Sequence, residues 1–174
     1  LILNEILEMN PTDIDSMHRL VDLLPEKQQL DALLKLKEDA WQIIQDNFND
    51  IEDLYYNHDT RPYMVILFDL LERYERNKKV EEAYQIIKEM MELNHGDNLG
   101  ERFHLVAYYI GQNKINELRD FVEKCPENSS VALRFAILYL DNLDKNDKEF
   151  KSLYDEFPYL YALIGKELYF KKYQ

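Results

Sequence analysis

The chain has 174 residues, of which 46% are hydrophobic and 32% charged, with only 4 Gly and 5 Pro, a balance that excludes disordered and collagen-like chains. The formal net charge of -13 argues against nucleic acid as a partner, because an acidic surface repels phosphate and no cluster of Lys and Arg interrupts it. No apolar run approaches the roughly 20 residues that span a bilayer, and the single Cys125 forms no internal disulfide, so we expect a soluble, cytoplasmic protein without a membrane partner.

Residues 1–24 are expected to form the end of one helical repeat and a following helix. Leu3, Ile6 and Pro11 have the pattern of a closing second helix, whose first helix would precede the sequence. Because the chain also opens at Leu1 without an initiator Met, we expect it to be a fragment of a longer protein.

Residues 25–59 are expected to form an irregular helical repeat and an acidic loop. Pro25 interrupts the chain, residues 27–48 have the pattern of one or two helices, and residues 46–59 are acidic and irregular. The residues expected to face inward are Leu30, Leu33, Leu34, Ala40, Trp41 and Ile44.

The second half of the chain repeats its pattern of residue types after 32 positions, the distance from Leu99 to Val131. The matching pairs are Leu99 with Val131, Phe103 with Phe135, Leu118 with Phe150, and Pro126 with Pro158. Apolar positions one turn apart in two successive segments, closed by a proline, indicate a helix hairpin. We therefore expect hairpins at residues 97–127 and 128–157, with a terminal helix at 158–174.

The preceding segment, residues 60–96, has a pattern of its own, carried by Leu67, Leu70, Leu71, Tyr74, Ala83, Ile87 and His95. At these spacings the segment resembles the tetratricopeptide repeat, with Tyr74 and Ala83 as the best matches. Leu71 stands where the family prefers Gly and His95 where it prefers Pro. The resemblance implies an all-α fold, an α-α superhelix in which antiparallel helix hairpins form a right-handed solenoid, with residues 1–174 as a single domain.

Two short signatures narrow the resemblance, one at residues 60–64 and one on Asn94, Asp97, Asn98, Gly100 and Arg102. They resemble those of a large, mostly uncharacterised group of bacterial tetratricopeptide-like proteins, related to the suppressor of tumorigenicity type. That group is defined by its scaffold, so the resemblance implies no activity.

The same signatures predict local structure at the helix starts. Pro62 suits the first turn of a helix, and Asp97 or Asn98 is expected to cap the next helix through its side-chain oxygen. Because successive first helices begin near one another in a stack, we expect Arg61 or Arg102 to pair with Asp97.

No catalytic residue, cofactor or metal ligand is predicted, because scattered glycines form no phosphate loop and Cys125 has no activating neighbour. An alternative is a metal-dependent enzyme of the di-iron type. Glu101-x-x-His104 and Asp15-x-x-His18 each place a carboxylate and an imidazole one helical turn apart.

The leading hypothesis is a non-enzymatic scaffold that binds a protein or peptide partner. Because the chain is acidic, a basic partner is favoured. In a tetratricopeptide stack the first helices line the concave side, which implies binding residues beside their packing stripes. The candidates are Val65, Phe68, Glu72, Glu75, Glu101, Leu105 and Tyr108. A further alternative is a structural spacer between other modules.

Overall fold

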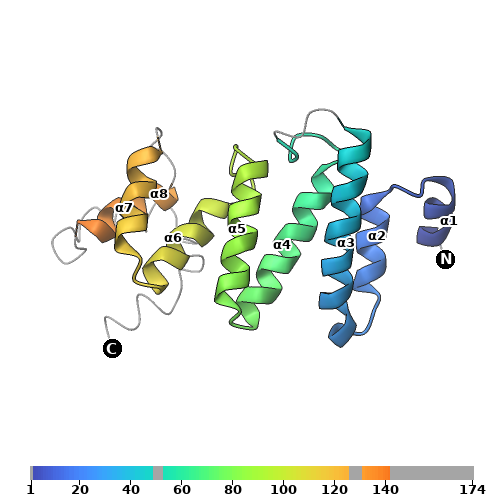
Figure 1. Ribbon diagram of the computed structural model, residues 1–174, viewed down its shortest axis with the longest axis horizontal. Helices are drawn as coiled ribbons and strands as arrows, with labels where there is room; N and C mark the ends of the chain where they lie inside the picture. The colour runs from blue at the N-terminus through green and yellow to red at the C-terminus, as the bar shows by residue number, and fades with distance from the viewer. Residues whose placement is uncertain (1, 49–52, 126–130, 142–174) are drawn as a thin grey trace. The chain divides into compact units, whose positions relative to one another are not determined.

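A computed structural model describes residues 2–48, 53–125 and 131–141 (Figure 1). All regular secondary structure in these residues is helical, which confirms the all-α class. The helices are α1 (Ile2–Met9), α2 (Ile14–Asp22), α3 (Glu26–Asn47), α4 (Arg61–Arg76), α5 (Val80–Leu93), α6 (Glu101–Gly111), α7 (Ile115–Lys124) and α8 (Val131–Leu140). The chain forms two compact units, Leu1–Leu99 and Gly100–Gln174, and each is described by itself.

In the first unit each helix packs against the helix before it, and α2 also contacts α4. Asp13 starts α2 by accepting a hydrogen bond from the Ser16 amide, and Pro62 lies in the first turn of α4, as predicted. The core centres on α4, because it packs against α2, α3 and α5. Its buried residues are Tyr63, Met64, Ile66, Leu67, Leu70, Leu71 and Tyr74.

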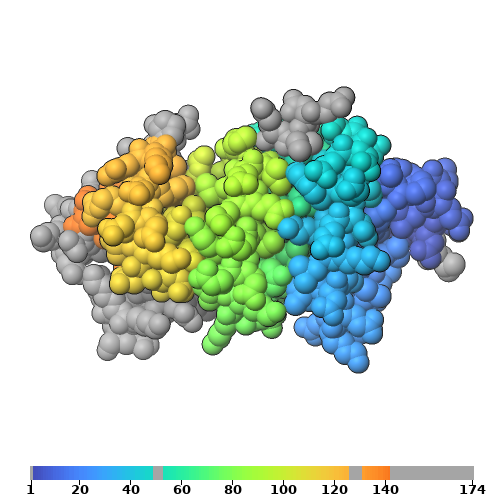
Figure 2. Space-filling view, in the orientation of Figure 1, coloured from blue at the N-terminus to red at the C-terminus, as the bar shows by residue number. Residues whose placement is uncertain are grey.

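Helix α3 is one continuous helix, and its buried stripe differs in part from the prediction, because Leu36 is buried and was not predicted, while Leu30 and Trp41 are only partly buried. Leu33, Ala40 and Ile44 are fully buried, as expected, but the Leu34 side chain is 37% exposed. One residue along a helix turns the side chain by about 100°, so the helices that cover Leu33 do not necessarily cover Leu34. Figure 2 shows the surfaces of α3, in blue to cyan, and α5, in green, side by side on one face of this unit.

The turn that joins α4 to α5 is a Schellman motif. Lys78 adopts a left-handed conformation with φ of 57°. The Lys79 amide then donates to the Tyr74 carbonyl at 2.9 Å, and the Lys78 amide to the Glu75 carbonyl at 3.0 Å. This turn reverses the chain within three residues and places α5 antiparallel to α4.

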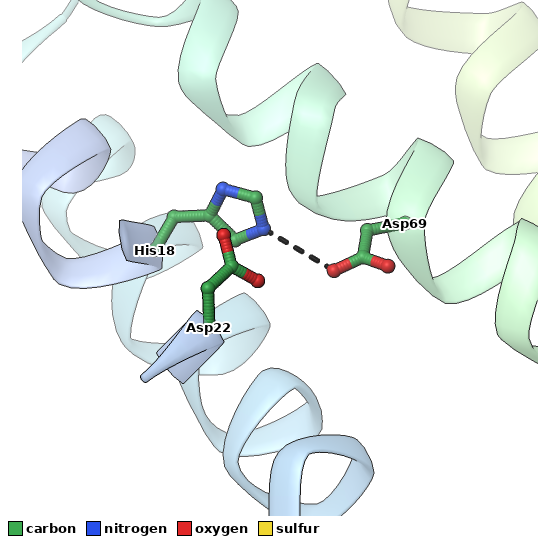
Figure 3. A group of neighbouring side chains, drawn as sticks. All are labelled: His18, Asp22 and Asp69. Carbon is green, nitrogen blue, oxygen red and sulfur yellow. Dashed lines mark hydrogen bonds and ion pairs between the residues drawn. The ribbon is translucent and has the colours of Figure 1, made fainter. Parts of the chain in front are cut away.

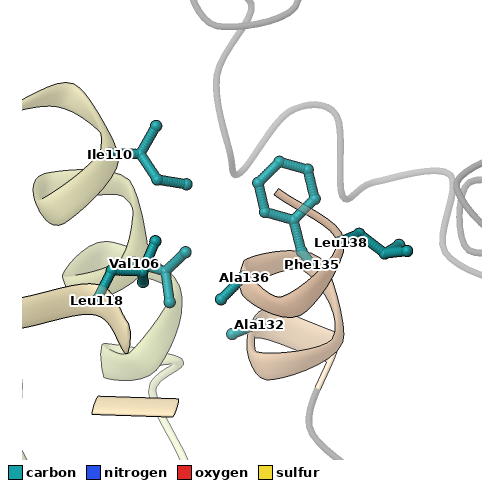
Figure 4. Close-up of a cluster of buried hydrophobic side chains, with 7 residues drawn as sticks. All are labelled: Val106, Ile110, Leu118, Ala132, Phe135, Ala136 and Leu138. Atoms are coloured by element: carbon teal, nitrogen blue, oxygen red, sulfur yellow. The ribbon is translucent and has the colours of Figure 1, made fainter. Parts of the chain in front are cut away.

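The second unit contains α6, α7 and α8, which contact one another around an apolar core (Figure 4). Its buried residues are Val106, Ile110, Leu118, Ala132, Phe135, Ala136 and Leu138. Val106 and Leu138, which the 32-position shift superposes, both belong to this core. The expected second helix of the hairpin at 128–157 and the terminal helix at 158–174 lie outside the described residues.

The turn between α6 and α7 repeats the geometry of the turn between α4 and α5. Asn113 is left-handed with φ of 54°. The Lys114 amide donates to Tyr109 at 2.8 Å and the Asn113 amide to Ile110 at 3.1 Å. Asn113 and Lys78 thus occupy equivalent positions in the two turns, and they lie 35 residues apart in the sequence. The two hairpins share one turn motif.

Candidate functional site

Three potential metal ligands from two helices converge in the first unit. His18 and Asp22 lie one turn apart on α2, and Asp69 reaches them from α4 (Figure 3). His18 Nε2 is 3.4 Å from Asp69 Oδ2, and the two side chains are only 12% and 18% exposed. One ligand atom from each of the three residues lies within 4.8 Å of the other two. We call this group the α2–α4 cluster.

Arg73 holds the Asp69 carboxylate from the far side of this cluster. Its Nε donates to Oδ1 at 2.9 Å, while its Nη2 lies 3.4 Å from Oδ2. Burial of the carboxylate acts to raise the pKa of Asp69, but hydrogen bonds from His18 and Arg73 and their positive charge outweigh it, so the pKa is lowered. Asp69 is therefore an ionised acceptor at neutral pH.

The cluster differs from the two carboxylate and histidine pairs that the sequence suggested. Asp15 turns away from His18 and forms an exposed ion pair with Arg19, with 2.7 Å between Oδ2 and Nε. Glu101, in the second unit, is buried at 1% exposure. Among the residues that the structure describes, only the α2–α4 cluster brings three such ligands together.

Asp22 and Asp69 were missed as functional candidates. The spacing of His18 and Asp22, four positions apart, could have revealed the pair, because such residues share one helix face. Asp69 had no comparable signal, since nothing in the sequence states that α4 contacts α2.

Four of the expected partner-binding residues lie on the outer side of α4, next to Asp69. Val65 is 43% exposed, Phe68 is partly buried, and Glu72 and Glu75 are exposed. Glu72 forms an ion pair with Arg76 one turn further, at 3.3 Å.

The other three candidates, all on α6, are buried. Glu101, Leu105 and Tyr108 are 1%, 4% and 8% exposed, so they offer almost no surface to a partner in this structure. Lys114 Nζ donates to the Tyr108 hydroxyl at 2.7 Å. These three side chains face inward. The sequence pattern of α6 alone does not show whether this side of the helix faces the interior or the solvent.

The expected ion pair between Arg61 and Asp97 does not form. Arg61 Nε donates to the Tyr55 carbonyl at 2.7 Å, and its guanidinium lies 5.1 Å from the centre of the Tyr55 ring. Arg61 thereby fixes the loop before α4 instead of a neighbouring repeat. Arg102 and Asp97 belong to different units, so their pairing stays a prediction.

The N-cap residue of α6 is neither of the two residues that were expected to cap it. The helix begins at Glu101 and its N-cap residue is Gly100, in a left-handed conformation with φ of 78°. Asn98 instead donates through Nδ2 to Asn94 Oδ1 at 2.8 Å, and accepts from the Tyr56 hydroxyl at 3.5 Å. These amides therefore belong to the loop that follows α5.

A separate pocket of about 290 Å³ lies where the turn before α2, the end of α3 and the start of α4 meet. Its polar lining consists of Asn10, Thr12, Asp13, Asp15, Asn47, His58 and Asp59. The His58 side chain is 96% exposed, and its Nδ1 lies 3.5 Å from Asp59 Oδ1. Two of the acidic side chains in the pocket have structural roles, because Asp13 caps α2 and Asp15 pairs with Arg19. These roles account for the two carboxylates without a bound ligand.

Comparison with known proteins adds no relative: no protein-family model matches this chain, and no significant match was found among curated proteins or solved structures. In the described residues, no helix is both long and apolar enough to cross a membrane.

Proposed function

We propose that this chain is a tetratricopeptide-like repeat protein that binds a protein or peptide partner and catalyses no reaction. The two equivalent Schellman turns support the repeat, because their spacing of 35 residues, 113 minus 78, is close to the 34-residue tetratricopeptide period. Tyr74 and Ala83, the best matches to the family pattern, are buried at 7% and 5% exposure, as packing positions require. In this proposal the hairpins continue as a right-handed superhelix.

The observation that carries the binding proposal is the outer face of α4. Val65 exposes 43% of its surface there, close in sequence to the partly buried Phe68 and to the acidic Glu72 and Glu75. An apolar residue among carboxylates suits a partner that offers an apolar side chain flanked by Lys or Arg. The net charge of -13 favours the same class of partner through long-range attraction.

A displayed library of random peptides tests this proposal without requiring that the natural partner be identified. We expect selection against the full chain to enrich peptides that combine apolar and basic residues. Binding of a selected peptide, followed by fluorescence anisotropy, should weaken as salt rises, because the charges on both sides are exposed.

Two matched variants locate the binding face. Val65→Asp should weaken peptide binding at least about tenfold, since the charge removes the apolar contact. Val80→Asp is the control, because Val80 is similarly exposed, at 39%, but lies at the start of α5. Failure to enrich any peptide family, or equal affinity of both variants, contradicts the proposal.

The alternatives make different predictions. A di-iron enzyme needs two carboxylate and histidine pairs and two further carboxylates in one bundle, whereas the described residues assemble one group of three ligands. A spacer between other modules has no preferred peptide, so the library selection separates it from a scaffold.

A further inference from the structure

We propose that His18, Asp22 and Asp69 form a binding site for one divalent transition metal ion, with zinc as the best-suited metal. This site joins α2 to α4. It is independent of the proposed partner binding, because it rests on other side chains and needs no peptide.

The positions of the ligand atoms carry the proposal. Zinc bonds of about 2.0–2.2 Å to nitrogen and oxygen place neighbouring ligand atoms about 3.4 Å apart in a tetrahedral site. His18 Nε2 and Asp69 Oδ2 already lie 3.4 Å apart, and all three ligand atoms fall within 4.8 Å of one another. Asp22 is exposed at the end of α2, so rotation of its side chain supplies the remaining approach.

The chemistry of the donors selects the class of metal. One imidazole nitrogen and two carboxylate oxygens suit zinc and its first-row neighbours, whereas calcium and magnesium prefer ligand sets made of oxygen alone. Three protein ligands leave a further position for water. Two carboxylates also match the double charge of the ion.

Arg73 determines which oxygen of Asp69 faces the cluster. Its Nε binds Oδ1 at 2.9 Å and leaves Oδ2 directed at His18. Metal-binding carboxylates are commonly oriented by such a hydrogen bond from a second residue. The Arg73 charge opposes the metal ion, particularly through Nη2 at 3.4 Å from Oδ2.

The test compares two aspartates on the same helix. The tag-free full chain, stripped with chelator and then dialysed, is titrated with zinc chloride in a calorimeter. We expect one equivalent to bind, and Asp22→Asn to raise the dissociation constant at least about tenfold. Asp15→Asn is the matched control, because Asp15 is also exposed on α2 but pairs with Arg19, and it should leave zinc affinity unchanged.

Absorption of bound cobalt provides a second readout, since its visible bands report the coordination geometry. We expect bands of a four- or five-coordinate ion in the wild-type chain and their loss in His18→Ala. Absence of stoichiometric zinc binding, or an equal effect of the Asp22 and Asp15 variants, overturns the proposal and shows that the cluster is only a hydrogen-bonded contact between α2 and α4. Neither result bears on peptide binding.

Discussion

The Tyr63 hydroxyl on α4 donates a hydrogen bond of 2.6 Å to Glu89 Oε1 on α5. The other carboxylate oxygen of Glu89 lies 2.7 Å from Lys37 Nζ on α3. Glu89 therefore joins three helices of the first unit. The Trp41 ring completes the contact, with its centroid 5.3 Å from that of Tyr63.

Replacing Tyr63 by Phe removes this hydrogen bond and keeps the ring. We expect the free energy of unfolding to fall by about 1–2 kcal/mol, because the acceptor is charged but retains Lys37 as a partner. Urea denaturation measures the change. Tyr56→Phe is the control: Tyr56 is 66% exposed, so its loss should change stability by less than about 0.5 kcal/mol. Equal effects would show that the Glu89 contact contributes nothing specific.

The same tyrosine predicts how stability depends on pH. Burial of Tyr63 disfavours the phenolate, and Glu89 adds a hydrogen bond and a negative charge, so the pKa of Tyr63 is raised above the ordinary 10.0. Above about pH 10 the unfolded chain releases this proton and the folded chain keeps it, so the stabilisation present below pH 10 is lost as pH rises. Wild-type stability should fall more steeply than that of Tyr63→Phe between about pH 9 and about pH 11. Parallel curves would contradict this assignment.

Thr60 anchors the loop before α4. Its buried hydroxyl donates to the Leu54 carbonyl at 2.8 Å, and the Leu54 amide donates to the Leu93 carbonyl at 2.9 Å. Thr60→Val keeps the shape of the side chain but leaves the Leu54 carbonyl without this hydrogen bond. The free energy of unfolding should fall by about 1–3 kcal/mol, and hydrogen exchange of the Leu54 amide should become faster. Thr60→Ser retains the hydroxyl and serves as the control. Unchanged exchange in the valine variant argues against the anchor.

Neighbouring leucines on α3 test the packing of the first unit. Leu33 is fully buried, so Leu33→Ala should lower the free energy of unfolding by about 2–5 kcal/mol through the cavity it leaves. Leu34, at 37% exposure, should lose less than about 1 kcal/mol on the same change. Chemical denaturation of both variants measures the difference. A larger effect at Leu34 would mean that α3 is rotated from the orientation described.

Lys78 occupies the left-handed position of its Schellman turn, with φ of 57°, where Gly is normally preferred. Lys78→Gly should therefore stabilise the chain by about 1 kcal/mol, seen as a rise in melting temperature. Lys78→Ala separates the backbone effect from loss of the side chain, because alanine keeps the strain. At the equivalent Asn113 the gain should be smaller, since Asn tolerates this conformation.

Much of the helical architecture could be predicted because it depends on residues close in sequence. Pro62 marks the start of α4, and Tyr74 and Ala83 take the buried positions that their spacing indicates. Leu34 shows the limit of this approach, since a hydrophobic residue next to a buried stripe looks the same in sequence whether or not a neighbour covers it.

The candidate site was less predictable because it depends on which helices touch. The sequence pairs His18 with Asp15, but the fold pairs it with Asp69, which lies 51 residues away. Likewise, Leu105 and Tyr108 lie beside the expected packing stripe of α6, yet both are buried. Local spacing defines the faces of a helix, and tertiary packing decides which of those faces meets another residue.

The bond from the Leu54 amide to the Leu93 carbonyl has a consequence for the order of folding. Its two ends are separated by the whole of α4 and α5, so this contact closes a longer loop than the contacts within the helix hairpin do. The helix hairpin is stabilised by nearer contacts and can assemble first. We therefore expect the loop around Leu54 to dock late in folding, so that its anchoring slows unfolding of the first unit more than it changes the folding rate.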